Sequence, residues 1–109
     1  MRRSADFSSV VRGGARARKG VVVVHQRCGL LADAAAGPVV GLIVSRAVGT
    51  SVTRHRVSRR LRAQLTPRLA ALPTASGTVI RALPAAAGAT SVSLGDDLDR
   101  AFAALARRR

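Results

Sequence analysis

Aromatic residues, cysteine and glutamate are scarce or absent in this chain of 109 residues. It has no tryptophan, tyrosine or glutamate, two phenylalanines and a single cysteine. One cysteine excludes an intrachain disulfide and a zinc site built from several thiolates, and it fits a reducing compartment. Two phenylalanine rings also argue against a domain that reads single strands by stacking bases on several exposed aromatic side chains.

Long apolar runs are missing as well. No such run in the sequence approaches the roughly 20 residues that a membrane-spanning helix needs. The opening Met1-Arg2-Arg3 leads into serine and aspartate rather than into the apolar core of a signal peptide. We therefore expect a cytoplasmic protein without a membrane partner.

Negative charge is in short supply. Five aspartates face 19 lysines and arginines, and the net charge is +14 with neutral histidines. Such an imbalance repels itself unless a polyanion or counterions screen it. Proteins that bind anionic membranes usually carry a basic amphipathic helix with tryptophan, phenylalanine or leucine anchors. Because tryptophan is absent, the composition favours nucleic acid as the partner.

Groups that could catalyse hydrolysis are few. Asp96, Asp97 and Asp99 are close enough in sequence to suggest a magnesium site, but carboxylates at a helix start more often cap the helix, and we predict that role. His25 and His55 are far apart and have no neighbouring acid or cysteine. We therefore expect neither a catalytic residue nor a metal ligand on this chain.

Hydrophobic periodicity predicts one domain over 1–109 with a helix, two or three strands, a helix, a strand and a final helix. The predicted helices cover 4–12, 51–65 and the segment from Asp96 onward, and the predicted strands cover 21–25, 39–45 and 77–83. Residues 15–19, which alternate small and basic side chains, lead into the first of these strands. Pro67 either ends the central helix at Thr66 or begins a second helix that Thr66 caps. This order predicts a two-layer α/β sandwich.

The predicted central helix is amphipathic. Val57, Leu61 and Leu65 fall on one side of it. The basic residues on the other side are His55, Arg56, Arg59, Arg60 and Arg62. Solvated helix faces normally mix acids with bases, and this segment contains no acid. Since guanidinium groups pair with phosphate oxygens and stay charged, we predict that this face binds phosphates.

Two other basic groups leave their interpretation open. Arg16, Arg18 and Lys19 form a second basic patch that either binds phosphate or is simply solvated. Three arginines at 107–109 suit the C-terminal end of a helix dipole, which accounts for them without a binding role.

Three segments, in register along most of the chain, resemble the bacterial ribonuclease P protein. Residues 52–62 are similar to the family signature Val-x-Arg-Asn-Arg-x-Lys-Arg-x-x-Arg, residues 41–49 to its Gly-Leu-x-Val-Ser-Lys-Lys-x-Gly strand, and residues 7–14 to its Phe-x-x-Val-Phe helix with a glycine stop. Among its departures from these patterns, His55 replaces asparagine, Ser58 replaces lysine, and Ala47 replaces a second lysine.

The resemblance implies an α+β fold in the order αβββαβα. Its sheet has about four mostly antiparallel strands, three helices accompany it, and the βαβ crossover is left-handed, against the usual rule. The implied function is the protein subunit of an RNA-based endoribonuclease that removes the 5′ leader of precursor tRNA. Its partners are the ribonuclease P RNA and precursor tRNA, with no DNA, and magnesium is bound mainly by the RNA.

Carried over by position, the resemblance assigns two groups of residues. Those implied to bind the RNA subunit are Arg46, Arg56, Arg59, Arg60 and Arg62, and those implied to bind the leader are Phe7, His25, Arg54 and His55. Phe7 could equally be a core residue, and the imidazole of His55 would make an altered contact where the family has an amide.

The same charge and fold class permit another interpretation. A ribosomal or RNA-assembly protein without enzymatic association would use the same basic helix. A helix-turn-helix regulator of DNA fits less well, because the basic helix follows a strand rather than a second short helix.

Overall fold

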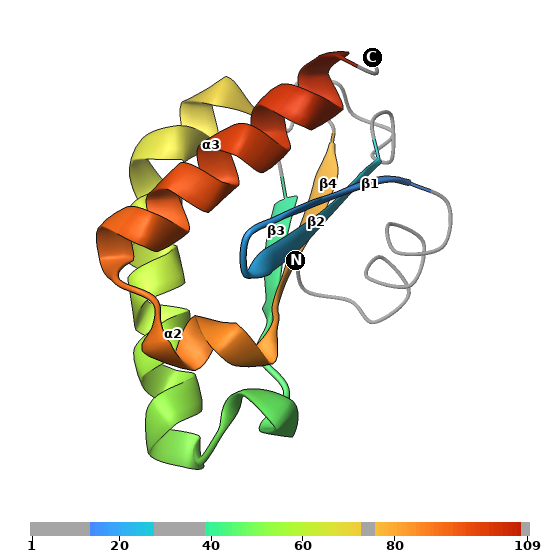
Figure 1. Cartoon of the computed structure of the whole chain (residues 1–109). Coiled ribbons are helices and arrows are strands. Elements are labelled where there is room, and N and C mark those ends of the chain that lie inside the picture. The colour runs from blue at the N-terminus through green and yellow to red at the C-terminus, as the bar shows by residue number, and fades with distance from the viewer. Residues whose placement is uncertain (1–13, 28–38, 73–75, 108–109) are drawn as a thin grey trace.

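The computed structural model describes residues 14–27, 39–72 and 76–107 of the chain (Figure 1). The predicted helix over 4–12, Phe7 with it, and Cys28 lie outside these residues. The strands are β1 (Ala15–Lys19), β2 (Val22–Arg27), β3 (Val39–Ile43) and β4 (Gly77–Ala82), and the long helices are α2 (Ser51–Leu65) and α3 (Ser91–Arg107). Three short 3-10 helices complete the described part: η1 (Arg46–Val48), η2 (Thr66–Ala71) and η3 (Pro84–Gly88).

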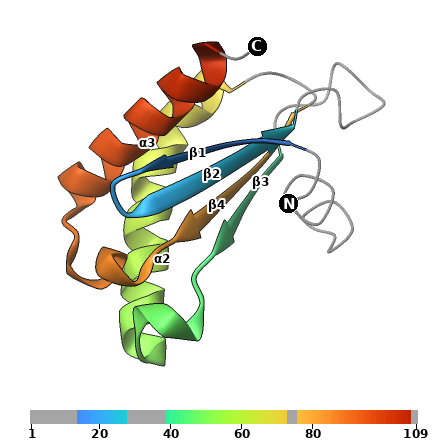
Figure 2. The same ribbon diagram turned by 45° about the vertical axis from the view of Figure 1, so that its right-hand side comes forward.

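The four strands form one sheet in the order β1-β2-β4-β3. β1 pairs with β2 and β2 with β4 in antiparallel fashion, whereas β3 and β4 run parallel. Parallel neighbours need a crossover connection, and α2 supplies it between β3 and β4 (Figure 2). The prediction of a mostly antiparallel sheet of about four strands is confirmed. The left-handedness of the crossover stays an expectation from the resemblance.

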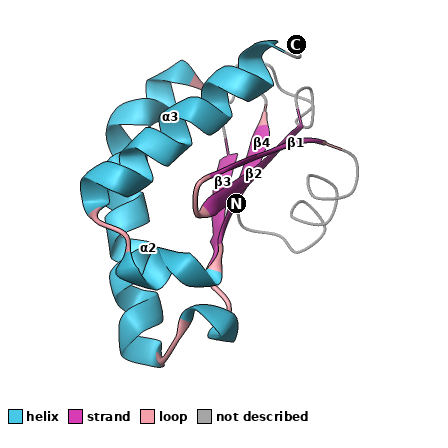
Figure 3. Cartoon of the chain, in the orientation of Figure 1, coloured by secondary structure: helices cyan, strands magenta, loops and turns pink. Residues whose placement is uncertain are grey.

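The helices α2 and α3 lie together on one face of the sheet (Figure 3), which confirms the two-layer sandwich. Alternation along β2 explains the packing, because Val22 and Val24 point toward the helices and belong to the main core. From the helices, the core receives Val57, Leu61, Leu65, Leu94, Leu98, Ala101, Ala104 and Leu105. Full burial of one valine or leucine side chain contributes about 1.5–3 kcal/mol, so this interface holds the two layers together.

The helix α2 has the bounds that the sequence predicts. Thr50 caps it, since its Oγ1 accepts a hydrogen bond from the backbone N–H of Thr53 at 3.3 Å. Pro67 stands at the start of η2, so the chain continues in a new helical turn after Leu65 rather than stopping. Of the two alternatives for Pro67, the restarted helix is therefore the correct one, although Leu65 rather than Thr66 precedes it.

The start of α3 corrects the prediction. The helix begins at Ser91 rather than at Asp96, and Thr90 accepts a hydrogen bond from the N–H of Ser93 at 3.1 Å. Its first turn contains no acidic residue, so the predicted capping role of the aspartates is wrong. Gly95 obscured the helix in the sequence. It is buried where α3 crosses α2, and a Cβ there would overlap the side-chain oxygen of Gln64, so close packing outweighs the poor helix propensity of glycine.

Asp97, which does not cap the helix as predicted, instead joins α3 to the turn between β1 and β2. Lys19 pairs with Val22, which leaves Gly20 and Val21 as a two-residue turn, and Gly20 has the positive φ of 59° that such turns favour in glycine. The carboxylate of Asp97 accepts a hydrogen bond from the N–H of Val21 at 3.1 Å and another from Arg100. This aspartate therefore stabilises the fold.

Neither long helix, and none of the shorter ones in the three described segments, is both long and apolar enough to cross a membrane.

Candidate RNA-binding surface

The side of α2 that faces away from the core carries basic residues and no acid. His55, Arg59 and Arg62 are exposed there, while Arg54 and Arg60 are half-buried. The arrangement follows from helical spacing, because Val57, Leu61 and Leu65 are all buried on the opposite side. The predicted amphipathic character is confirmed, and the exposed guanidinium groups give this surface a dense positive charge.

Two arginines of this helix also contact the protein. The Nη2 of Arg56 donates a hydrogen bond to the carbonyl oxygen of Ala87 at 3.2 Å, and Nη1 of Arg60 donates to that of Ala89 at 2.8 Å. Both acceptors lie in or just after η3, the segment that leads into α3. Arg56 and Arg60 therefore attach α2 to the connection between β4 and α3, a role that the sequence pattern did not reveal.

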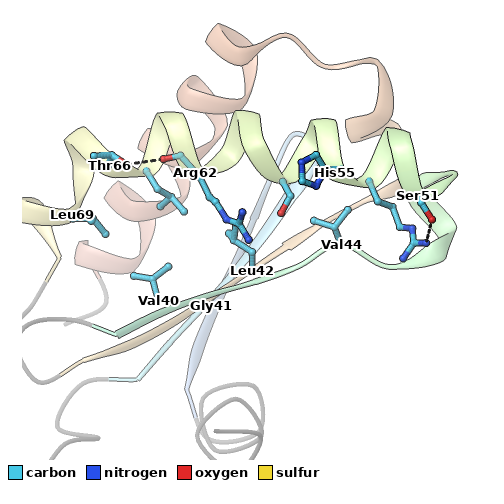
Figure 4. Close-up of a pocket in the computed structure, with 12 residues that line it drawn as sticks. Val40, Gly41, Leu42, Val44, Ser51, His55, Arg62, Thr66 and Leu69 are labelled. Carbon is cyan, nitrogen blue, oxygen red and sulfur yellow. Dashed lines mark hydrogen bonds between the residues drawn. The ribbon is translucent and has the colours of Figure 1, made fainter. Parts of the chain in front are cut away.

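A groove separates α2 from the edge strand β3 (Figure 4). Its volume is about 790 Å³. Arg54, His55 and Arg62 line its helical side. Nη2 of Arg54 donates a hydrogen bond to Oγ of Ser51 at 3.2 Å, which holds this guanidinium against the first turn of the helix. Two of the residues predicted to bind the leader, Arg54 and His55, thus lie at one groove.

Arg46 extends the basic surface beyond the helix. It is exposed in η1, the short turn between β3 and α2. The N–H of Gly49 donates to the carbonyl oxygen of Arg46 at 3.2 Å, which closes the turn. Because η1 precedes α2 directly, Arg46 adds a cation near the N-terminal end of the arginine helix.

His25 lies on the other face of the sheet. Since Val24 points toward the helices, its neighbour His25 points away from them, between Arg16 of β1 and Val79 of β4 in register. Only 5% of the residue is exposed. Burial, together with the positive charges of Arg81 and Arg16, lowers the pKa of His25. The structure therefore separates His25 from Arg54 and His55, and Phe7 lies outside the described residues.

Two acidic residues of α3, Asp97 and Asp99, stabilise the fold. Asp99 forms a salt bridge with Arg68, with 2.7 Å between Oδ1 and Nε. The hydrogen bond from Arg68 lowers the pKa of the Asp99 carboxyl. Within residues 14–27, 39–72 and 76–107, no group of three or more histidine, cysteine, aspartate or glutamate side chains is placed to hold a metal ion.

Comparison with known proteins gives a consistent result. The model of the ribonuclease P family matches residues 1–106. The ribonuclease P protein component of Salinispora tropica is 44% identical, over 95% of this chain and 88% of that relative. That of Corynebacterium diphtheriae is also 44% identical, over 97% and 92%.

Solved structures show the same fold. The RNase P protein of Staphylococcus aureus superposes with a TM-score of 0.81 at 19% identity, covering 95% of this chain and 92% of that one. The Thermotoga maritima RNase P protein gives 0.77 at 17% identity, covering 98% and 94%. At such low identity, the superposition establishes the arrangement of helices and strands.

Proposed function

Because the chain belongs to the ribonuclease P protein family, we propose that it assists a catalytic RNA in removing the 5′ leader of precursor tRNA. The observation that carries this proposal is the acid-free basic side of α2, which matches the family signature in position and lies on the molecular surface. A protein that neutralises phosphates releases their counterions, and this release supplies much of its affinity for RNA.

In this proposal, the RNA subunit binds the surface that continues from η1 along α2. Arg59 and Arg62 are exposed and offer whole guanidinium forks, and Arg46 adds a further cation. Arg56 and Arg60 keep further N–H groups beyond the ones that they donate to Ala87 and Ala89, so they contribute to the same surface from a fixed position.

The leader is assigned to Arg54 and His55, with His25 and Phe7 as further contacts. Arg54 and His55 line the groove beside β3, and His25 lies on the opposite sheet face near Arg16 and Arg81. Hydrolysis, with the magnesium that it needs, is placed on the RNA subunit. The protein acts in the cytoplasm by screening phosphate repulsion and by positioning the substrate.

Reconstitution tests the proposal. The full chain, added to its cognate RNA subunit at low magnesium, should raise the rate of leader removal from precursor tRNA, since the basic surface takes over part of the screening that magnesium otherwise provides. Arg62→Ala should require more protein for the same rate. Arg107→Ala removes the same charge from an exposed position at the end of α3 and serves as the matched control.

A chain that binds structured RNA without raising the rate would point to a ribosomal or RNA-assembly protein and would overturn the proposal. If Arg62→Ala and Arg107→Ala raised the amount of protein needed by the same factor, α2 would have no specific role in binding the RNA.

A further inference from the structure

The groove between β3 and α2 combines an apolar floor with a cationic rim. β3 is an edge strand, and its Val40 and Leu42, followed by Val44, pack against the margin of the core and are half-buried in the groove. The rim is formed by Arg54 and Arg62 of α2, as Figure 4 shows for Arg62 and Leu42. A ligand that fits must therefore offer both a flat apolar surface and negative charge.

The buried end of Arg54 indicates where the negative charge belongs. Its Nη2 donates to Ser51, but its Nε is buried and has no hydrogen-bond acceptor within the part of the chain that the structure describes. A buried donor without an acceptor is costly, especially when it carries charge. A phosphate oxygen in the groove would pair with the N–H groups of this guanidinium that face the groove and would offset the cost of its partly buried charge.

The groove is also continuous with the outer surface of α2. His55 lines the groove, and it lines as well a shallow depression on the outer side of the helix together with Val52, Arg56 and Arg59. A polyanion bound along the arginines therefore passes the mouth of the groove. The volume of about 790 Å³ lies within the range of small-ligand sites, roughly 300–1,000 Å³. An unpaired base enters such a site more readily than a paired one, because it does not have to be unpaired and unstacked first.

We propose that this groove holds one unstacked nucleotide of the bound RNA, with its base on Leu42 and Val44 and the backbone phosphates on its two sides at Arg54 and Arg62. The proposal rests on the proposed function, which supplies the RNA partner. It adds a base-contacting site, on the helix-covered side of the sheet, to a surface otherwise assigned to phosphate contacts. Because the net charge is +14, a nucleic acid is favoured over a peptide strand added to the β3 edge.

Methyl NMR of the full chain tests the occupant directly. A single-stranded octanucleotide should shift the methyl signals of Leu42 and Val44 upfield, because the ring current of a base acts on the methyl groups beneath it. An abasic octanucleotide of the same length and charge should bind the arginines without this shift. Val92, which is 71% exposed on α3, provides a reference methyl group away from the groove.

Filling the groove provides the second measurement. Ser58→Trp places an indole in the groove without changing the net charge, and it should weaken binding of the base-bearing octanucleotide by about fivefold, to the level of the abasic one. Ser93→Trp makes the same replacement at an exposed position of α3 and should leave both affinities unchanged. If the Ser58 variant does not fold, the methyl shifts of the unaltered chain still decide.

The outcomes separate the two proposals. Binding of both octanucleotides without upfield shifts at Leu42 and Val44 would leave the RNA-binding role intact and overturn the groove inference. An extended acidic peptide that shifts these methyl groups when the octanucleotide does not would assign the groove to a protein partner and also overturn it. Failure to bind either octanucleotide, together with no gain in leader removal, would count against the proposed function itself.

Discussion

Neighbouring arginines on one helix carry different tasks. Arg59 is exposed and has no hydrogen bond to another element among the residues that the structure describes, whereas Arg60 donates to the carbonyl oxygen of Ala89 at 2.8 Å. The residue types in the sequence are the same, so the sequence could predict the basic face but not this division. The division depends on where η3 ends, and only the tertiary structure gives that position.

The pair Arg59→Ala and Arg60→Ala tests the division. Both changes should weaken RNA binding and reduce the salt dependence of log K by about 0.7–0.9 per lost phosphate contact. Arg60→Ala alone should also lower the free energy of unfolding, by about 1 kcal/mol, because the Ala89 carbonyl loses its donor. Salt-titrated binding and urea denaturation measure the two effects. Equal stability of the two variants would show that the Arg60 contact has no structural weight.

The buried position of His25 should make the free energy of unfolding depend on pH. Burial and the charges of Arg81 and Arg16 lower its folded-state pKa below the unfolded value of 6.5. Below pH 6.5 the unfolded chain therefore binds a proton that the folded chain resists, so the free energy of unfolding falls as the pH drops toward the folded-state pKa. At higher pH both states are neutral at this group and the penalty disappears.

Urea denaturation between pH 7.5 and pH 5 checks this prediction. His25→Gln should flatten the decline in stability, and His55→Gln, which alters an exposed imidazole, is the control. A decline that persists unchanged in His25→Gln would assign the pH dependence to other groups.

At the scale of elements, the sequence predicts a helix boundary where neighbouring residues determine it and fails where contacts remote in sequence determine it. The bounds of α2 follow from a local pattern, a threonine cap and buried residues at helical spacing, and the sequence predicts both ends correctly. The start of α3 does not follow from a local pattern, because Gly95 makes the segment resemble a loop. Only the close contact with Gln64 explains a glycine at this position. The capping role predicted for the aspartates is wrong for a related reason, since Asp97 also binds Val21 and Asp99 binds Arg68, and both of these partners are remote in sequence.

The turn between β1 and β2 is where a local and a distant constraint coincide. Gly20 has a φ of 59°, and a Cβ at this position would overlap the carboxylate of Asp97. Gly20→Ala should therefore lower the free energy of unfolding by roughly 2 kcal/mol or more, from left-handed backbone strain and from displacement of the carboxylate. Gly88→Ala introduces the same methyl group where nothing lies within 4 Å and should change stability little. Urea denaturation of both variants provides the comparison, and an unchanged Gly20→Ala would show that the hairpin and Asp97 adjust freely.

At the scale of the whole molecule, the binding surface follows from how the sheet is ordered. β3 lies at one edge beside β4, and the crossover helix α2 therefore runs along that edge with its arginines outward. Composition alone predicts a polyanionic partner, and the three matched segments predict the family. Neither the composition nor the matched segments could show that His25 lies on the face of the sheet away from α2. That position follows from the pairing of β2 with β1 and β4, which separates His25 from Arg54 and His55.

The net charge of +14 predicts opposite responses to salt for folding and for binding. Few acids offset the 19 basic residues, so the free chain repels itself, and raising sodium chloride from 20 mM to 500 mM should increase its Tm by shortening the Debye length from roughly 20 Å to a few ångströms. Over the same range RNA affinity should fall steeply, because each displaced counterion becomes more costly to release. Thermal denaturation and RNA binding in matched buffers measure both trends. If Tm fell with salt while affinity also fell, the excess charge would not be a destabilising force in the free protein, and its screening by RNA could not add to the stability of the complex.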